Sequence, residues 1–102
     1  MKKFIVRIEL RNSEDADYDG LHKKMSENGF YRHAGFSGSD QAFHLPNAEY
    51  MYLDVKGLRS ISYICQLAKV AAEAVRPYPK VLVVEVKDSF QFGLDVCHFE
   101  QQ

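Results

Sequence analysis

The sequence has no excess of charge of either sign. Thirteen Lys and Arg residues stand against fourteen Asp and Glu residues in a chain of 102, which gives a net charge of −1. The two halves of the chain carry similar numbers of each sign, so charge alone does not predict strong non-specific binding of nucleic acid. Apolar runs are also short. None approaches the roughly 20 residues of a membrane-spanning helix, and we expect no membrane partner.

Cysteine and glycine are too sparse for a disulfide framework or a phosphate-binding loop. The two cysteines, Cys65 and Cys97, are typical of a protein of the reducing cytosol, and we predict a cytoplasmic location. No glycine-rich phosphate motif occurs among the six glycines. The histidines and cysteines stand at no metal-ligand spacing, so we expect neither a metal ion nor another cofactor.

One acidic pattern matches the first half of a calcium-binding loop. It consists of Asp15, Asp17 and Asp19, followed by Gly20. The twelfth position of such a loop needs a bidentate Glu, and Ser26 occupies it here. We interpret the three carboxylates as the acidic start of a helix and predict no calcium binding.

Hydrophobic periodicity predicts two helices and four main strands within a single domain, residues 1–102. Pro46 falls inside one predicted strand and marks a bulge, an edge or a break there. The predicted elements are a strand at 3–11, a helix at 16–28, strands at 30–36 and 42–54, a helix at 61–75, a strand at 80–87 and a short strand at 89–99.

This order predicts an α+β fold of the ferredoxin-like βαββαβ type. Such a sandwich has a four-stranded antiparallel sheet with two helices on one face, here followed by a short C-terminal strand. The alternating and helical spacings also predict which side chains form the core. They are Phe4, Val6, Ile8, Leu21, Met25, Ile61, Ile64, Ala68 and Ala72.

The sheet face that the helices leave uncovered is the candidate site. Alternation places Arg7 and Arg11 on it, and the second strand offers Arg32 and His33. Arginines beside tyrosines can hold the phosphates and bases of RNA, so we take the three arginines as RNA-binding candidates and His33 as the catalytic acid–base candidate. Two other interpretations remain open. The charges form cross-strand ion pairs on a plain surface, or Ile5, Met51 and the tyrosines form a dimer face.

Three stretches of the chain resemble a family of small bacterial proteins. They are Lys3–Leu10, Asp17–Met25 with Gly29-Phe30, and Phe43–Tyr50. The family is that of the GhoS antitoxins of type V toxin–antitoxin systems, together with related domains of unknown function. The resemblance implies a ferredoxin-like fold and an endoribonuclease that cleaves messenger RNA. The matching residues are mostly core and turn residues, so no catalytic residue is carried over from the family.

Two hypotheses of function follow, and the sequence leaves open whether the protein is an enzyme. The first is an RNA-binding endoribonuclease of a toxin–antitoxin or defence system. The second is a non-catalytic, homodimeric module that binds a protein partner and is encoded by a mobile element. We expect a homodimer because Ile5 and Met51 interrupt a polar face and the strand at 89–99 is a spare edge.

Overall fold

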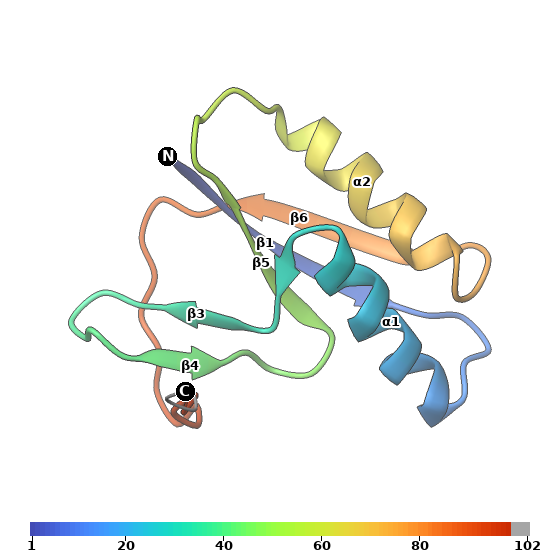
Figure 1. Ribbon diagram of the computed structural model, residues 1–102, viewed down its shortest axis with the longest axis horizontal. Helices are drawn as coiled ribbons and strands as arrows, with labels where there is room; N and C mark the ends of the chain where they lie inside the picture. The colour runs from blue at the N-terminus through green and yellow to red at the C-terminus, as the bar shows by residue number, and fades with distance from the viewer. Residues whose placement is uncertain (99–102) are drawn as a thin grey trace.

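The computed structural model describes residues 1–98 and contains two helices and six strands over that part of the chain (Figure 1). The helices are close to the predicted ones, and the first strand begins and ends within two residues of its prediction. The elements are β1 (Lys2–Glu9), α1 (Asp15–Glu27), β2 (Phe30–Tyr31), β3 (His33–Gly35), β4 (Ala42–His44), β5 (Glu49–Asp54), α2 (Ile61–Glu73) and β6 (Lys80–Glu85).

Three antiparallel strand pairings build one four-stranded sheet in the order β2-β5-β1-β6. Both helices lie on the same face of this sheet (Figure 1). The strands β3 and β4 form a separate two-stranded sheet, a hairpin that extends beyond the edge of the main sheet. The fold is therefore α+β, with two helices and an antiparallel sheet, as the sequence predicted.

Local interactions define the ends of both helices. The Ser60 hydroxyl accepts the backbone N–H of Tyr63 at 3.1 Å and caps the start of α2. Gly29 follows the end of α1 with a φ of +86°, a conformation that glycine adopts without strain. No helix within residues 1–98 is both long and apolar enough to cross a membrane.

The core lies between the helices and the sheet, and most of its members are the predicted ones. Phe4, Val6 and Ile8 alternate inward along β1 because successive side chains of a strand point to opposite faces. Tyr50 and Tyr52 of β5 are also buried beneath the helices. The remaining buried core residues include Leu10, Leu21, Met25, Phe30, Ile64, Ala68, Ala71 and Ala72.

One predicted core residue is wrong. Ile61 is the first residue of α2 and remains 45% exposed, whereas Ile64, one turn later, is completely buried. The helical spacing of Ile61 is compatible with the buried stripe, but Ile61 is the first residue of α2 and the buried residues of this helix begin at Ile64.

Two predicted strands are each divided in the structure. The stretch 30–36 separates at Arg32 into β2, which pairs with β5, and β3, which pairs with β4. The stretch 42–54 breaks around Pro46, where a turn closes with the N–H of Glu49 donating to the Pro46 carbonyl at 3.1 Å. Proline cannot donate to a ladder, so the break is one of the three outcomes that Pro46 predicted.

The predicted strand at 89–99 is not formed over its described part, residues 89–98. A single bridge joins Val96 to Phe43 of β4. On either side of it, the N–H of His44 donates to the Asp95 carbonyl and the N–H of Cys97 donates to the Ala42 carbonyl, both at 2.8 Å. Residue 99 lies outside the described residues. This segment is engaged with β4, so it is not the spare edge from which a dimer was expected.

Candidate functional site: the cleft beneath the hairpin

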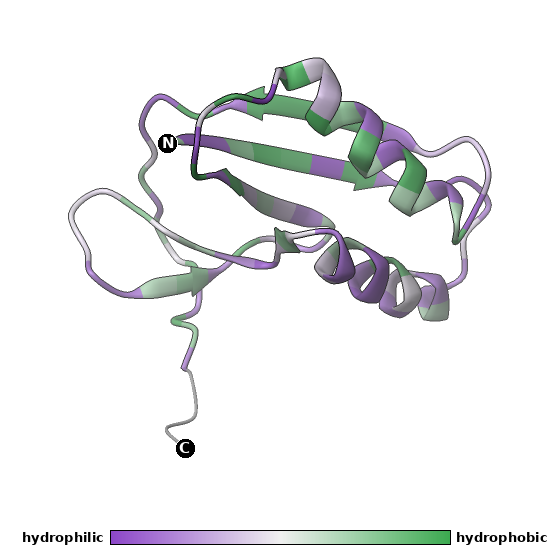
Figure 2. Cartoon of the chain, turned by 45° about the horizontal axis from the view of Figure 1, so that its top comes forward, coloured by the Kyte–Doolittle hydropathy of each residue, from purple (hydrophilic) through white to green (hydrophobic). Residues whose placement is uncertain are grey.

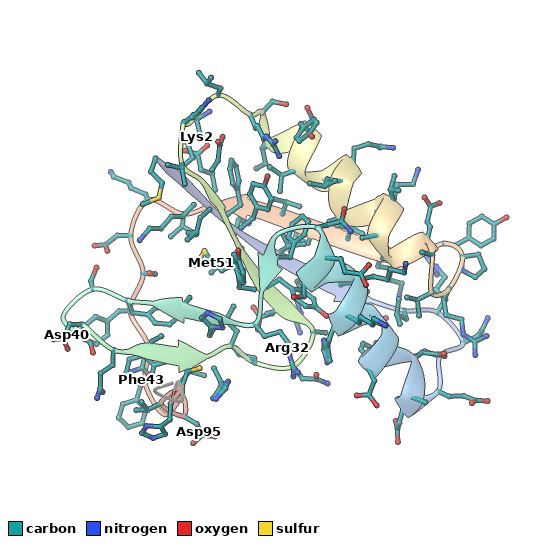
Figure 3. All side chains as sticks on the ribbon, viewed as in Figure 1. Lys2, Arg32, Asp40, Phe43, Met51 and Asp95 are labelled. Carbon is teal, nitrogen blue, oxygen red and sulfur yellow. The ribbon has the colours of Figure 1, made fainter. Side chains whose placement is uncertain are left out.

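The hairpin of β3 and β4 covers part of the sheet face opposite the helices. Met51 of β5 belongs to that face, yet it is only 3% exposed. Ala34 and Phe43 face one another across the hairpin and are buried as well. Figure 3 shows the Met51 side chain leaving β5 on the side of the hairpin. A second, smaller apolar cluster therefore lies outside the main core, and Met51 cannot serve as an exposed dimer contact.

Two adjoining cavities lie between the hairpin and the sheet, and together we call them the hairpin cleft. The apolar cavity has a volume of about 400 Å³, and the polar cavity has a volume of about 440 Å³. Met1, Lys3 and Gly35 line both. The apolar cavity is further lined by Tyr31, His33, Ala34, Met51 and Leu53, and the polar cavity by Phe36, Ser37, Ser39, Val86, Lys87, Asp88 and Ser89.

The polar cavity is held in shape by hydrogen bonds between the hairpin and the segment after β6. The Ser37 hydroxyl donates to Asp88 Oδ1 at 2.5 Å, and the Ser37 N–H donates to the Ser89 carbonyl at 3.1 Å. The bond from Ser37, together with the backbone N–H of Ser89, holds the pKa of Asp88 below its usual value. Asp88 is therefore a carboxylate at neutral pH, in a cavity that Lys3 and Lys87 also line.

The three candidate arginines lie on different parts of the molecule. Arg7 is exposed on the uncovered sheet face, opposite Glu49 of β5. Arg11 lies beyond the end of β1, where its Nε donates to the Tyr78 carbonyl at 2.8 Å. Arg32 joins β2 to β3 and lies between the hairpin and α1 (Figure 3). The structure does not gather them into the single phosphate-binding patch that an RNA site would need.

His33, the acid–base candidate, lines the apolar cavity. Its ring lies 5.7 Å from the ring of Tyr31, centroid to centroid, and the two rings are tilted by 43°. The two aromatic side chains form one wall of the hairpin cleft, and Met51 and Leu53 form another part of it.

A second polar contact lies on the helix side of the sheet. His22 Nδ1 and the hydroxyl of the completely buried Tyr50 are 2.6 Å apart and share a hydrogen bond. Burial lowers the pKa of His22, and the positive charge of nearby Arg32 lowers it further. Burial raises the pKa of Tyr50. The neutral imidazole of His22 can accept or donate this hydrogen bond, depending on which ring nitrogen carries the proton.

The acidic pattern near residue 17 belongs to a helix. Asp15, Asp17 and Asp19 all lie in α1, and Asp17 Oδ2 accepts the N–H of Glu14 and the Nε of Arg76, each at 2.8 Å. These two bonds, with the backbone bond the larger cause, hold the pKa of Asp17 below its usual value. Among residues 1–98, no group of three or more His, Cys, Asp or Glu side chains is arranged to hold a metal ion.

Sequence reasoning missed the hairpin cleft as a site. Leu53 carries no motif, and Ser37 and Asp88 are separated by 51 residues, so no local pattern could pair them. Tyr31, His33 and Met51 line the cleft and were visible in the sequence, but they were interpreted as parts of an RNA site or a dimer face. Comparison of the chain with protein-family models, with curated proteins and with solved structures found no match.

Proposed function

We propose that this protein is a non-catalytic binding module that receives an extended segment of a protein partner in the hairpin cleft. The observation that carries the proposal is the apolar cavity of about 400 Å³, with Tyr31, Met51 and Leu53 in its lining. That volume is within the range of specific ligand sites and suits one large apolar side chain. The hydroxyls of Ser37 and Ser39 line the adjoining cavity and offer hydrogen bonds to the backbone of the same segment.

The scaffold of this module is best described as ferredoxin-like. The order β2-β5-β1-β6, with every pairing antiparallel, supports this assignment. The hairpin of β3 and β4 is then an insertion between the second and third strands of the sandwich. In this view the sandwich holds the floor of the cleft, and the insertion supplies its wall.

Fragment binding followed by NMR tests the module. N-acetyl-leucinamide and N-acetyl-phenylalaninamide are expected to shift the amide signals of Tyr31, Ala34 and Leu53. N-acetyl-glycinamide lacks the side chain and should leave them unchanged. Leu53→Lys, which places a charge in the cavity, is expected to abolish the shifts, because burying an unpaired charge is costly.

Leu58→Lys is the matched control for this substitution. Leu58 is an exposed leucine in the loop between β5 and α2, outside the lining of the hairpin cleft. The control protein should bind the leucine and phenylalanine probes as the parent does. Equal shifts with the glycine probe, or equal loss in both lysine variants, would show that the cleft does not select an apolar side chain, and the proposal would fail.

The endoribonuclease that the GhoS resemblance implies is a second candidate, and one observation favours it. Burial lowers the pKa of His22, and Arg32 is close enough for its charge to lower that pKa further. In the tautomer whose Nδ1–H donates to the Tyr50 hydroxyl, Nε2 of His22 is free to remove the proton of a ribose 2′-hydroxyl. A nearby guanidinium can stabilise the developing negative charge on the phosphate. In this proposal His22 replaces His33 as the acid–base residue, and Arg32 is the single arginine of the original three that takes part.

Incubation of the pure protein with total bacterial RNA tests this second candidate. Cleavage is expected to disappear in His22→Gln, whose amide still offers Tyr50 a hydrogen bond, and in Arg32→Ala. His44→Gln, at an exposed position of β4, is the control and should cleave normally. If the parent protein leaves the RNA intact, the enzyme proposal is wrong and the binding module stands alone.

A further inference from the structure

The outer side of β6 carries unpaired backbone groups. The N–H of Val86 donates to the Lys3 carbonyl at 2.7 Å, in line with the β1–β6 register, so these two residues form a hydrogen-bonded pair. Hydrogen-bonded pairs alternate along an antiparallel ladder, and the N–H and C=O groups of Val81, Val83 and Glu85 therefore point away from the sheet. Such a row of groups is a template for another strand.

The side chains along this edge are mainly apolar. Figure 2 shows β6 as a largely hydrophobic strand. On the uncovered face Leu82 is 62% exposed and Val84 is 46% exposed. On the helix side Val81 and Val83 are half-buried. No proline lies within β6 and its two charged residues, Lys80 and Glu85, stand at its ends, so the middle of the strand lacks the usual protection against pairing with another strand.

One flank of α2 lies above this edge. On the opposite flank, Tyr63 contacts the Arg59 guanidinium at 4.9 Å from the ring centroid, and Arg59 in turn bonds to the Tyr52 hydroxyl on β5. The Tyr63 side of α2 therefore faces the middle of the sheet. Ile61 and Lys69 are spaced by about two turns on the other side of the helix and lie towards the free edge of β6.

Lys69 and Glu85 have opposite charges that can pair between two molecules of this protein, although they do not pair within one molecule. Neither Lys69 nor Glu85 takes part in any of the ion pairs found within residues 1–98. The strand β6 runs opposite to α2 (Figure 1), so Lys69 lies near the start of β6 and Glu85 lies at its end. When two β6 strands pair antiparallel, the end of one meets the start of the other. Each Glu85 then approaches the Lys69 of the second copy.

We propose that two copies of this chain pair antiparallel through β6, with the two-fold axis at Val83. The two four-stranded sheets then become one continuous sheet, and Val81 of each copy faces Glu85 of the other. A register centred on Leu82 would instead place Pro79 opposite Glu85, and the Glu85 carbonyl would lose its hydrogen bond because proline has no N–H.

Strand pairing alone would not bury enough surface for a stable dimer. A stable dimer buries roughly 800 Å² per partner, which six strand residues do not supply. The exposed flanks of the two α2 helices meet across the same axis and add a second layer of contact. The interface does not involve the lining of the hairpin cleft, so the proposal is independent of the function assigned to that cleft.

The mass in solution is the first test. Light scattering should give twice the monomer mass of 11.7 kDa at high concentration and a concentration-dependent approach to 11.7 kDa on dilution. Val83→Pro removes an N–H that points away from β1, so the variant should keep the parent's circular dichroism spectrum and become monomeric. A parent protein that stays at 11.7 kDa at the highest concentration overturns the proposal.

Charge reversal tests the contact between the copies. Glu85→Lys should raise the dimer dissociation constant about 10-fold or more, because two cations then face one another across the axis. Combining it with Lys69→Glu should restore the parent constant. Lys56→Glu, in the turn after β5, is the control and should change nothing. If Val83→Pro and Glu85→Lys both dimerise as the parent does, the interface lies elsewhere and the proposal is wrong.

Cross-linking tests the register. In a background with Cys65→Ser and Cys97→Ser, Val83→Cys should form a disulfide-linked dimer on mild oxidation. Directly opposed residues of a hydrogen-bonded pair have Cα atoms about 5.5 Å apart, which a disulfide can span. Leu82→Cys should cross-link much less. The reverse order of yields would refute the axis at Val83.

Discussion

The two faces of the main sheet are built from the same strands but are closed in different ways. On one face Phe4, Val6 and Tyr50 meet the helices and form a continuous core. On the other face only Met51 is deeply buried, because the hairpin reaches that part of β5, and Leu82 and Val84 remain exposed. One face is closed by regular helices, and the other is partly closed by an inserted hairpin and the segment after β6.

The two faces therefore have different roles, one in stability and the other in binding. The helix face contains nearly all of the large buried side chains, so it accounts for most of the free energy of unfolding. The opposite face contains the hairpin cleft and the exposed edge of β6, where surface is left for partners. Substitutions on the two faces should therefore differ in kind as well as in size.

The largest expected effect comes from Phe4, which lies on the helix face and is completely buried. Phe4→Ala should lower the free energy of unfolding by about 3–5 kcal/mol, since it opens a cavity in the core. Its neighbour Ile5 points to the opposite face and is half-buried. Ile5→Ala should cost less than about 2 kcal/mol. Urea denaturation measures both, and equal losses would show that the two faces contribute alike.

A smaller contrast is expected within α2. Ile64→Ala should cost about 2–4 kcal/mol, because Ile64 is completely buried. Ile61→Ala, one turn earlier on the same helix, should cost about 1 kcal/mol or less in the monomer. Thermal unfolding of both variants provides the measurement. A cost at Ile61 that matches the cost at Ile64 would mean that the first turn of α2 is packed as tightly as the rest.

A pH effect should arise from His22. Its pKa in the folded protein is below the ordinary value of 6.5, so the unfolded chain binds more protons below that pH. Its contribution to stability is therefore complete above about pH 6.5 and is lost as the pH falls through the folded-state pKa. Denaturation at pH 7 and pH 5.5 should show a smaller loss for His22→Gln than for the parent. Identical losses of stability in the two proteins would show that the lowered pKa of His22 is not the cause.

The smallest and most local effect is expected at the hairpin. Ser37→Ala removes the bond to Asp88 at an exposed position, so global stability should change little. Amide hydrogen exchange in β3 and β4 should nevertheless become faster, because this bond ties the hairpin to the segment after β6. Exchange in α2 should stay the same and serves as the internal control. Faster exchange in both regions would show that the hairpin opens only when the whole fold does.

Local patterns predicted much of the fold. The alternation of Phe4, Val6 and Ile8 predicted β1 and its buried face, and the helical spacing of Ile64 and Ala68 predicted the buried side of α2. These signals act over a few residues, and their physical causes are the two-residue period of a strand and the 3.6-residue period of a helix. The divided strands and the hairpin were not predicted, since pairing between distant segments decided them.

The candidate site was less accessible to sequence reasoning. Arg7 and Arg11 are four residues apart on one strand pattern, yet the chain turns after β1 and Arg11 bonds to the Tyr78 carbonyl. Arg32 follows the edge strand β2 and comes to lie beside α1. Side chains alternate between the two faces of a sheet only while the strand continues. The predicted arginine patch therefore does not form, because Arg11 and Arg32 lie beyond the ends of β1 and β2.

The sequence by itself determined the α+β class, the two helices and the identity of most core residues. It could do so because side-chain periodicity and turn chemistry are local properties that tertiary contacts reinforce in this protein. Only the tertiary structure decided that Ser37 meets Asp88, that Met51 is covered, and that β6 presents a free edge. Each of these depends on segments tens of residues apart, whose approach is determined by the packing of the whole chain and by no pattern within either segment.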